Sequence, residues 1–193
     1  KPFALEEMTR ILNCERGVFK NILGVAFFTG MRAGEILALK WKDINFENKS
    51  ITIETQRTRG YTKKPKTKSS IRTIDMISQC EVFLKEQRKS TGLGEYVFLN
   101  TKNKVFYGSG DLQYKWYDVL RRLKLEKRGL HQTRHTFASN MLSNMENPLW
   151  VSQMLGHKSL VITLNTYTKY IKKDRNAKTT FLDNMNLQFC TNL

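Results

Sequence analysis

Apolar residues recur every three or four positions near the start of the chain, which is the spacing of one face of an α-helix. This spacing predicts a first helix that carries Leu5 to Leu12 and a second that carries Phe19 to Phe27. Gly30 is expected to end the second helix, because glycine readily adopts the left-handed conformation found at helix ends. A third, short helix is expected over residues 33–39.

The period then changes to two, which is the spacing of a β-strand with one buried face. Residues 50–55 place Ile51 and Ile53 on one side, and residues 68–74 are a second candidate strand. Residues 56–67, between them, contain a glycine, a proline and several lysines. That composition is typical of a long exposed hairpin tip.

Helical spacing returns in the second half of the chain. Helices are expected over residues 78–90, 111–123, 133–145, 148–155 and 161–170, and residues 96–99 are a candidate short strand. The fold class is therefore α+β, mostly α-helical with a small antiparallel β-sheet. A polar stretch after the last helix predicts that residues 1–172 form one domain and residues 173–193 a C-terminal tail.

The net charge of the chain limits the classes of binding partner. The chain of 193 residues has 33 Lys and Arg against 17 Asp and Glu, a net charge of +16. This excess favours a polyanion, which could be DNA, RNA or an acidic membrane surface. No apolar run approaches the ~20 residues that a membrane span requires, and no leader peptide is expected. Three widely spaced cysteines indicate free thiols in a reducing cytosol and predict neither a zinc site nor disulfides.

Five side chains have the chemistry to act on a phosphodiester without a metal. Arginine binds non-bridging oxygens with a planar fork, histidine transfers protons near neutral pH, and tyrosine is a competent nucleophile. The candidates are Arg32, Arg134, His131, His157 and Tyr167. Each also has an ordinary structural interpretation: an arginine paired with Glu35 three residues on, a helix-capping histidine, or a core tyrosine.

Four segments around these residues resemble the signature motifs of one family. They are Thr-Gly-Met-Arg-Ala-Gly-Glu-Ile (29–36), His-Gln-Thr-Arg-His-Thr-Phe-Ala (131–138), Leu-Gly-His (155–157) and Thr-Leu-Asn-Thr-Tyr (163–167). Together they resemble the tyrosine recombinases, the phage-type integrases, in order and in separation. The resemblance runs from Phe3 to about Lys172 and implies the catalytic-domain fold of that family.

The resemblance also implies a mechanism. Tyr167 attacks the scissile phosphate, a 3′-phosphotyrosine forms, and a 5′-hydroxyl leaves. Lys68 is the favoured proton donor to the leaving oxygen, with Lys66 as the alternative, and His131 assists proton transfer at the nucleophile. The groups that stabilise the transition state are Arg32, Arg134 and His157. Glu35 and His135 are expected to support the site, and neither a metal nor a cofactor is expected.

The segment from residue 57 to residue 72 has many cations and no acid, which suits a finger lying along DNA. Its candidate DNA-binding residues are Arg57, Arg59, Lys63, Lys64, Lys66 and Arg72. Such a run is also compatible with a merely solvated face.

The implied partners are double-stranded DNA and further recombinase protomers in a tetrameric synapse, where the tail of one protomer docks on the next. The family's N-terminal DNA-clamping domain is absent from this sequence, so a fragment is expected, acting on nucleoid DNA in the cytoplasm. The alternatives are an inactive DNA-binding relative, an enzyme like the type IB topoisomerases, and a phosphate- or RNA-binding module.

Overall fold

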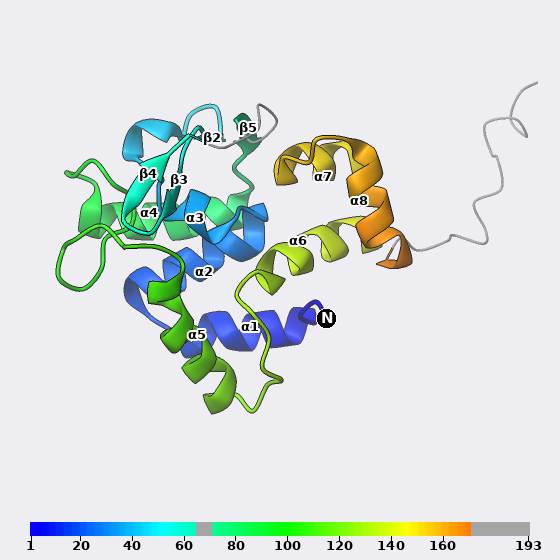
Figure 1. The fold of residues 1–193 in the computed structure, drawn as a ribbon, viewed down its shortest axis with the longest axis horizontal. Helices are drawn as coiled ribbons and strands as arrows, with labels where there is room; N and C mark the ends of the chain where they lie inside the picture. The colour runs from blue at the N-terminus through cyan, green and yellow to red at the C-terminus, as the bar shows by residue number, and fades with distance from the viewer. Residues whose placement is uncertain (65–70, 171–193) are drawn as a thin grey trace, which may run out of the picture.

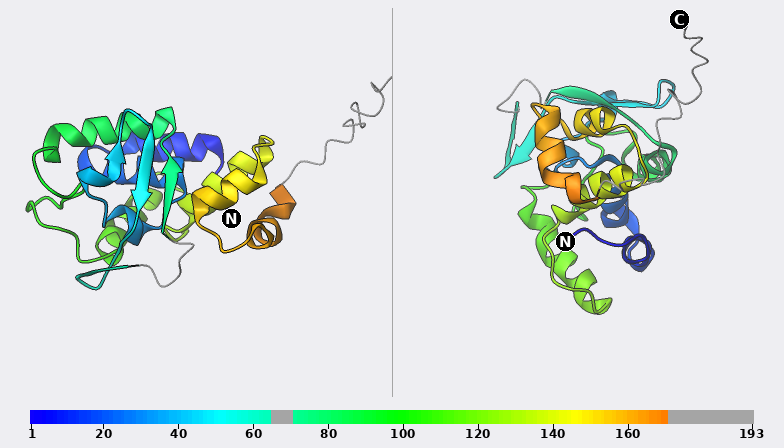
Figure 2. Two further views of the ribbon diagram at one scale, coloured as in Figure 1. Left: turned by 90° about the horizontal axis from the view of Figure 1, so that it is seen from above. Right: turned by 90° about the vertical axis from the view of Figure 1, so that its right-hand side faces the viewer.

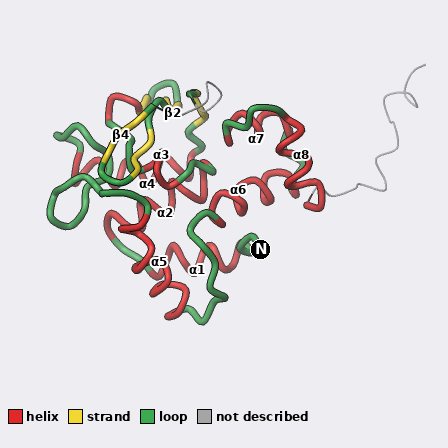
Figure 3. Tube along the Cα trace, viewed as in Figure 1, coloured by secondary structure: helices red, strands yellow, loops and turns green. Residues whose placement is uncertain are grey.

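The computed structural model describes residues 1–64 and 71–170. Helices dominate it, and the strands form two small antiparallel sheets (Figures 1 and 3). The helices are α1 (Leu5–Cys14), α2 (Gly17–Thr29), α3 (Ala33–Ile36), α4 (Ser78–Thr91), α5 (Gly110–Arg122), α6 (Gln132–Ser143), α7 (Pro148–Leu155) and α8 (Leu160–Tyr167), with 3-10 turns η1 (Trp41–Asp43) and η3 (Thr168–Tyr170). The strands are β1 (Ile44–Asn45), β2 (Ser50–Ile53), β3 (Gln56–Thr58), β4 (Tyr61–Lys63) and β5 (Arg72–Asp75). The expected class is confirmed.

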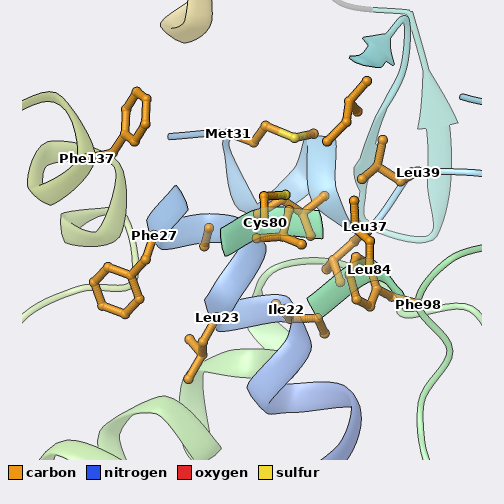
Figure 4. Packing of buried hydrophobic residues seen from close by; sticks show 14 of the residues in the cluster. Ile22, Leu23, Phe27, Met31, Leu37, Leu39, Cys80, Leu84, Phe98 and Phe137 are labelled. Carbon is orange, nitrogen blue, oxygen red and sulfur yellow. The ribbon is translucent and has the colours of Figure 1, made fainter. Parts of the chain in front are cut away.

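Helix α2 forms the centre of the molecule and packs against α4 and α6. Its apolar side chains Ile22, Leu23 and Phe27 are buried. They belong to the same hydrophobic cluster as Leu84 of α4 and Phe137 of α6 (Figure 4). Each such side chain contributes about 1.5–3 kcal/mol when fully buried, so this cluster holds the elements around the site in place.

The larger sheet has the strand order β1-β2-β5. Ile51 of β2 is opposite Ile44 of β1 and Ile74 of β5, and Ile51, Ile53 and Ile74 are buried. The alternation in the sequence therefore predicted the inner face of β2 correctly. Strand β5 brings Arg72 next to α7, with which the strand is in contact.

Strands β3 and β4 form a separate hairpin within the region expected to be an exposed tip. Arg59 and Gly60, at its turn, both have positive φ (49° and 83°), as a two-residue hairpin turn requires. The backbone N–H of Gly60 donates to the carbonyl of Tyr107 at 2.7 Å. Sequence periodicity missed the hairpin because this anchoring contact lies far along the chain. Residues 65–70, with Lys66 and Lys68, lie outside the described residues.

Other helix boundaries differ slightly from expectation. Helix α3 ends at Ile36, and α8 ends at Tyr167 before the turn η3. Residues 96–99 make isolated bridges, Lys40 to Tyr96 and Leu99 to Val105, in place of a strand. Within the described residues, no helix is both long and apolar enough to cross a membrane.

Helices α6, α7 and α8 pack on one another at one side of the molecule (Figures 1 and 2). The N-terminal segment runs beside α6, where the backbone N–H of Phe3 donates to Oγ1 of Thr136 at 2.9 Å. Three of the four sequence motifs lie on this helical group, so the fold brings them to one place.

Candidate active site

Arg134 connects three helices from the interior of the site. Its side chain is buried in α6, and its two terminal nitrogens donate to the carbonyls of Gly30 (2.8 Å) and Leu155 (2.7 Å). Those carbonyls lie at the C-terminal ends of α2 and α7, where the helix dipole favours a cation. Burial lowers the pKa of Arg134 to about 9, so the guanidinium stays charged at neutral pH. Each terminal nitrogen keeps a second N–H for a ligand.

Gly30 makes this arrangement possible. Its φ of +65° ends α2, and an added Cβ would lie 2.6 Å from the Phe137 ring and 2.8 Å from Leu155. Only glycine lets the end of α2 approach α6 and α7 this closely. The chain then turns into α3 and places Arg32 beside Arg134.

Arg32 and Arg72 share one buried carboxylate, Glu35. Arg32 lies 2.8 Å from Glu35, and Arg72 donates to both of its oxygens at 3.2 and 3.1 Å. Burial alone would raise the pKa of Glu35, but the hydrogen bonds and charges of Arg72 and then Arg32 outweigh it and lower that pKa. Glu35 therefore stays ionised. The side chain of Arg32 is 38% exposed, which leaves it open to a ligand.

Arg72 lies in the site and not on an exposed finger. Its side chain is 8% exposed, and Nε donates to the carbonyl of Met154 at 3.0 Å. Its prediction as a DNA-binding residue came from the charge run alone, and the contacts with Glu35 and Met154 indicate a positioning role instead. Arg72 thereby links strand β5 to α3 and to the end of α7.

His157 is positioned by the turn that follows α7. Gly156 has φ +66°, and an added Cβ would lie 2.9 Å from three side-chain atoms of Arg72. Nδ1 of His157 is hydrogen-bonded to Oγ1 of the buried Thr163, at 2.7 Å. This contact fixes the ring and leaves Nε2 for a ligand. Thr163 belongs to the motif that ends in Tyr167.

His131 and His157 are held neutral by the same surroundings. The pKa of each is lowered to about 4, chiefly by desolvation, and then by His135 and the arginines for His131 and by the arginines for His157. Arg134 and Arg32 act on both rings. The shared influence of these two arginines shows that four of the predicted residues form one electrostatic cluster.

Tyr167 reaches this cluster through His135. Its side chain is buried, and its hydroxyl is 2.8 Å from Nδ1 of His135. Burial raises the pKa of Tyr167, partly offset by the charge of Arg134. Tyr170, in contrast, is half-buried in η3, and its backbone carbonyl accepts a bond from Ser143 at 3.0 Å. The structure thus bonds Tyr167 to α6 through its own hydroxyl, and Tyr170 to α6 through its backbone carbonyl.

The predicted DNA-binding residues of the cationic segment differ in how far they are exposed. Arg57 is half-buried, and it donates to the Phe106 carbonyl and to Oγ1 of Thr62. The exposed cations are Arg59, Lys63 and Lys64. Their contact with DNA stays a prediction, as do the roles of Lys66 and Lys68 outside the described residues.

Sequence reasoning missed two positioning contacts, from Arg72 to Glu35 and from Thr163 to His157. It also assigned His135 only to support. A signal for His135 was present, because it follows His131 by four residues and therefore shares its helix face. The partner of Arg72 had no local signal, because 37 residues separate it from Glu35.

A hollow continues the site toward α5. It is lined by Arg32 and His131 on one side and by Gln113 and Tyr117 of α5 on the other. Within the described residues, no group of three or more His, Cys, Asp or Glu side chains is placed to hold a metal ion.

Comparisons with known proteins agree with this geometry. A profile of the phage integrase family matches residues 3–173. The prophage integrase IntR of Escherichia coli K12 is 27% identical over 88% of this chain and 47% of its own. A XerC-like tyrosine recombinase of Caldanaerobacter subterraneus subsp. tengcongensis is 31% identical over 94% of this chain and 54% of its own. The chain thus spans about half the length of these relatives.

The fold also matches a solved structure. The integrase of the transposon Tn1549, bound to a circular intermediate DNA, superposes with a TM-score of 0.80 at 21% identity, covering 95% of this chain and 66% of its own. At that identity the likeness concerns the fold. The family profile, however, covers most of the sequence together with all four motifs. The chain therefore belongs to the phage integrase family and carries the catalytic-domain region of a tyrosine recombinase.

Proposed function

We propose that this chain cleaves and rejoins DNA at specific sites through a covalent 3′-phosphotyrosine on Tyr167, in the integration or recombination of a phage or mobile element. The observation that carries the proposal is the shared cluster of Arg32, Arg134, His131 and His157, with Tyr167 hydrogen-bonded to His135, the residue that follows Arg134 in α6. Such a cluster stabilises the charge of a pentavalent phosphate with donors that are already in place.

Within this function, Arg32 and Arg134 bind the two non-bridging oxygens, and His157 donates to one of them through Nε2. Lys68, or else Lys66, protonates the leaving 5′-oxygen. The phosphotyrosine conserves the energy of the broken bond, so that a second strand can rejoin without ATP. No cofactor or metal takes part, and cleavage therefore proceeds in EDTA.

The proposed substrate is double-stranded DNA of the nucleoid, in the cytoplasm. The net charge of +16 supports it, and the Tn1549 integrase of the same fold was solved with DNA. The exposed hairpin cations Arg59, Lys63 and Lys64 can lie along its phosphates. The hollow lined by Arg32 and by residues of α5 is a further surface that the DNA can occupy.

The proposed partners are further protomers in a tetrameric synapse, with residues 173–193 docking on a neighbour. Those residues lie outside the described part of the chain, so tail exchange rests on their apolar sequence. Helices α7 and α8 nevertheless expose Leu149, Val161 and Ile162, side chains that a neighbouring apolar segment can cover.

A nicked suicide substrate tests the function. Cleavage releases a short strand from such a DNA, so that the covalent protein–DNA complex accumulates. The wild-type chain and Tyr170→Phe should both form a complex that survives denaturation, whereas Tyr167→Phe should form none while still binding DNA. Absence of the complex with wild type would favour a DNA-binding relative. Relaxation of a supercoiled plasmid without recombinant products would favour topoisomerase chemistry.

A further inference from the structure

We propose that His135 accepts the proton of Tyr167 during attack on the phosphate, and so acts as a catalytic base in its own right. This inference rests on the proposed function, because it assigns a partner to the nucleophile named there. It differs from the sequence-based expectation, in which His131 assists the nucleophile and His135 supports the fold.

The contact geometry carries the proposal. Nδ1 of His135 lies 2.8 Å from the Tyr167 hydroxyl, which is within the distance that direct proton transfer requires. The two rings are tilted by 54°, with centroids 5.6 Å apart. His135 directly follows Arg134 in α6, so one helical turn holds both the phosphate-binding guanidinium and the partner of the nucleophile.

The position of His131 fits this division of roles. Its ring meets His135 edge to face, at 5.0 Å and 88°, and it borders the hollow beside Arg32. His135 instead lines a second hollow, together with Tyr167. His131 thus faces the phosphate cluster, while His135 faces the nucleophile.

Charge sets the direction of the hydrogen bond. The pKa of His135 is lowered by burial, then by Arg134, the N-terminal amino group and Lys169, so its ring is neutral and one nitrogen carries a lone pair. A phenol is a better donor than acceptor, and imidazole nitrogen is a good acceptor. Tyr167 therefore donates to Nδ1, and it keeps its proton until the phosphate is attacked, because burial raises its pKa.

The Tyr167 oxygen forms a bond to phosphorus, its proton moves to Nδ1 of His135, and the bond from phosphorus to the 5′-oxygen breaks. The leaving oxygen takes its proton from the hairpin lysine. The negative charge of the bound phosphate offsets the charge of Arg134, which makes the imidazolium of His135 easier to form. On rejoining, His135 returns the proton to Tyr167.

The test compares His135→Ala and His135→Asn with Gln132→Ala as a control. Gln132 lines the same hollow and has no place in the chemistry. An asparagine oxygen can accept the bond from Tyr167, but it cannot take up the proton at neutral pH. We expect both His135 variants to cleave the suicide substrate slower by about 100-fold or more, with DNA affinity and folding kept and Gln132→Ala unchanged.

Two further readouts separate a base from a structural residue. Added imidazole should restore part of the rate of His135→Ala, because it can enter the vacated space. Replacing the leaving 5′-oxygen with sulfur should rescue a hairpin lysine variant but neither His135 variant, since their defect lies at the nucleophile. If His135→Ala fails to fold, His135→Asn alone is compared with wild type and with Gln132→Ala.

Cleavage by His135→Asn within about threefold of wild type, a step too small for the loss of a base, would overturn the proposal, and so would faster cleavage by either variant. Faster cleavage would mean that the contact restrains Tyr167. If wild type and Gln132→Ala form no adduct, the proposed function itself fails. If they form it and the His135 variants match them, only this inference fails.

Discussion

At the scale of single residues, side chains with the same charge have different environments. Arg134 is buried and donates to two helix-end carbonyls, whereas Arg32 is partly exposed beside Glu35. The motif positions of both were evident from the sequence, but only because they resemble a family. The local sequence pattern was equally compatible with an ion pair between Arg32 and Glu35. That ion pair is present in the structure, and the side chain of Arg32 is also exposed enough to contact a ligand.

Arg134→Lys should lose activity although it keeps the charge. The ammonium group of the lysine cannot donate to both the Gly30 and Leu155 carbonyls and also bind a phosphate. We expect cleavage to fall by about 100- to 1000-fold. The free energy of unfolding should fall by roughly 1–3 kcal/mol, since a buried carbonyl loses its donor. Single-turnover cleavage and urea denaturation measure the two effects, and near wild-type values for both would refute this account of Arg134.

At the scale of elements, hydrophobic periodicity predicted most helices and strand β2, because each buries one face locally. It did not predict the hairpin β3–β4 or the place of Arg72. Both depend on contacts with distant segments: Gly60 with Tyr107, and Arg72 with Glu35 and Met154. A lysine- and arginine-rich run contains nothing that separates a cation facing DNA from one pairing with a carboxylate in the interior.

Gly156→Ala tests how the turn before His157 is built. Alanine at a φ of +66° costs about 1–2 kcal/mol in strain, and its Cβ would also meet the guanidinium of Arg72. Gly17→Ala is a matched control, because Gly17 has φ +61° and open space around its Cβ position. We expect Gly156→Ala to be the less stable variant in thermal denaturation and to cleave slowly, with Gly17→Ala cleaving normally. Equal losses in both variants would argue against the packing of Arg72 on Gly156.

Removing the side chain of Arg72 and removing that of Arg59 should affect different properties of the protein. Arg72→Ala leaves Glu35 buried with one fewer partner, so the free energy of unfolding should fall by roughly 3 kcal/mol. Arg59→Ala removes an exposed hairpin cation, so stability should hold, while the salt dependence of DNA binding should weaken by about 0.9 in its log–log slope. Denaturation measures the stability of each variant, and DNA-binding titrations at several salt concentrations measure the log–log slope. The opposite pattern would place Arg72 on the DNA.

At the scale of the whole molecule, positive charge is concentrated at the proposed substrate site. Among the described groups at the site, Arg32, Arg72 and Arg134 surround one carboxylate, Glu35. After burial, this excess of positive charge contributes to keeping His131 and His157 neutral, and a bound phosphate would offset it. Binding of the proposed substrate would therefore stabilise the cluster.

Stability should fall as the solution is acidified from pH 6.5 toward pH 5. The pKa of His131 and of His157 is about 4 in the folded chain against an ordinary value of 6.5. In that window the unfolded chain binds more protons than the folded one, so acid favours unfolding, and the full stability is present only above pH 6.5. Urea titrations at pH 7 and pH 5 measure the fall, which a double His131→Asn, His157→Asn variant should reduce. A wild-type stability unchanged between the two pH values would contradict the lowered pKa values.

The proposed function requires that Tyr167 becomes covalently attached to DNA, and peptide mapping of the trapped adduct detects this attachment. Lysines at positions 158, 169 and 172 let trypsin separate residues 159–169, which contain Tyr167, from residues 170–172, which contain Tyr170. After nuclease digestion, we expect a nucleotide remnant on Tyr167 in the peptide 159–169. A remnant on the peptide 170–172, or on neither peptide, would contradict this expectation.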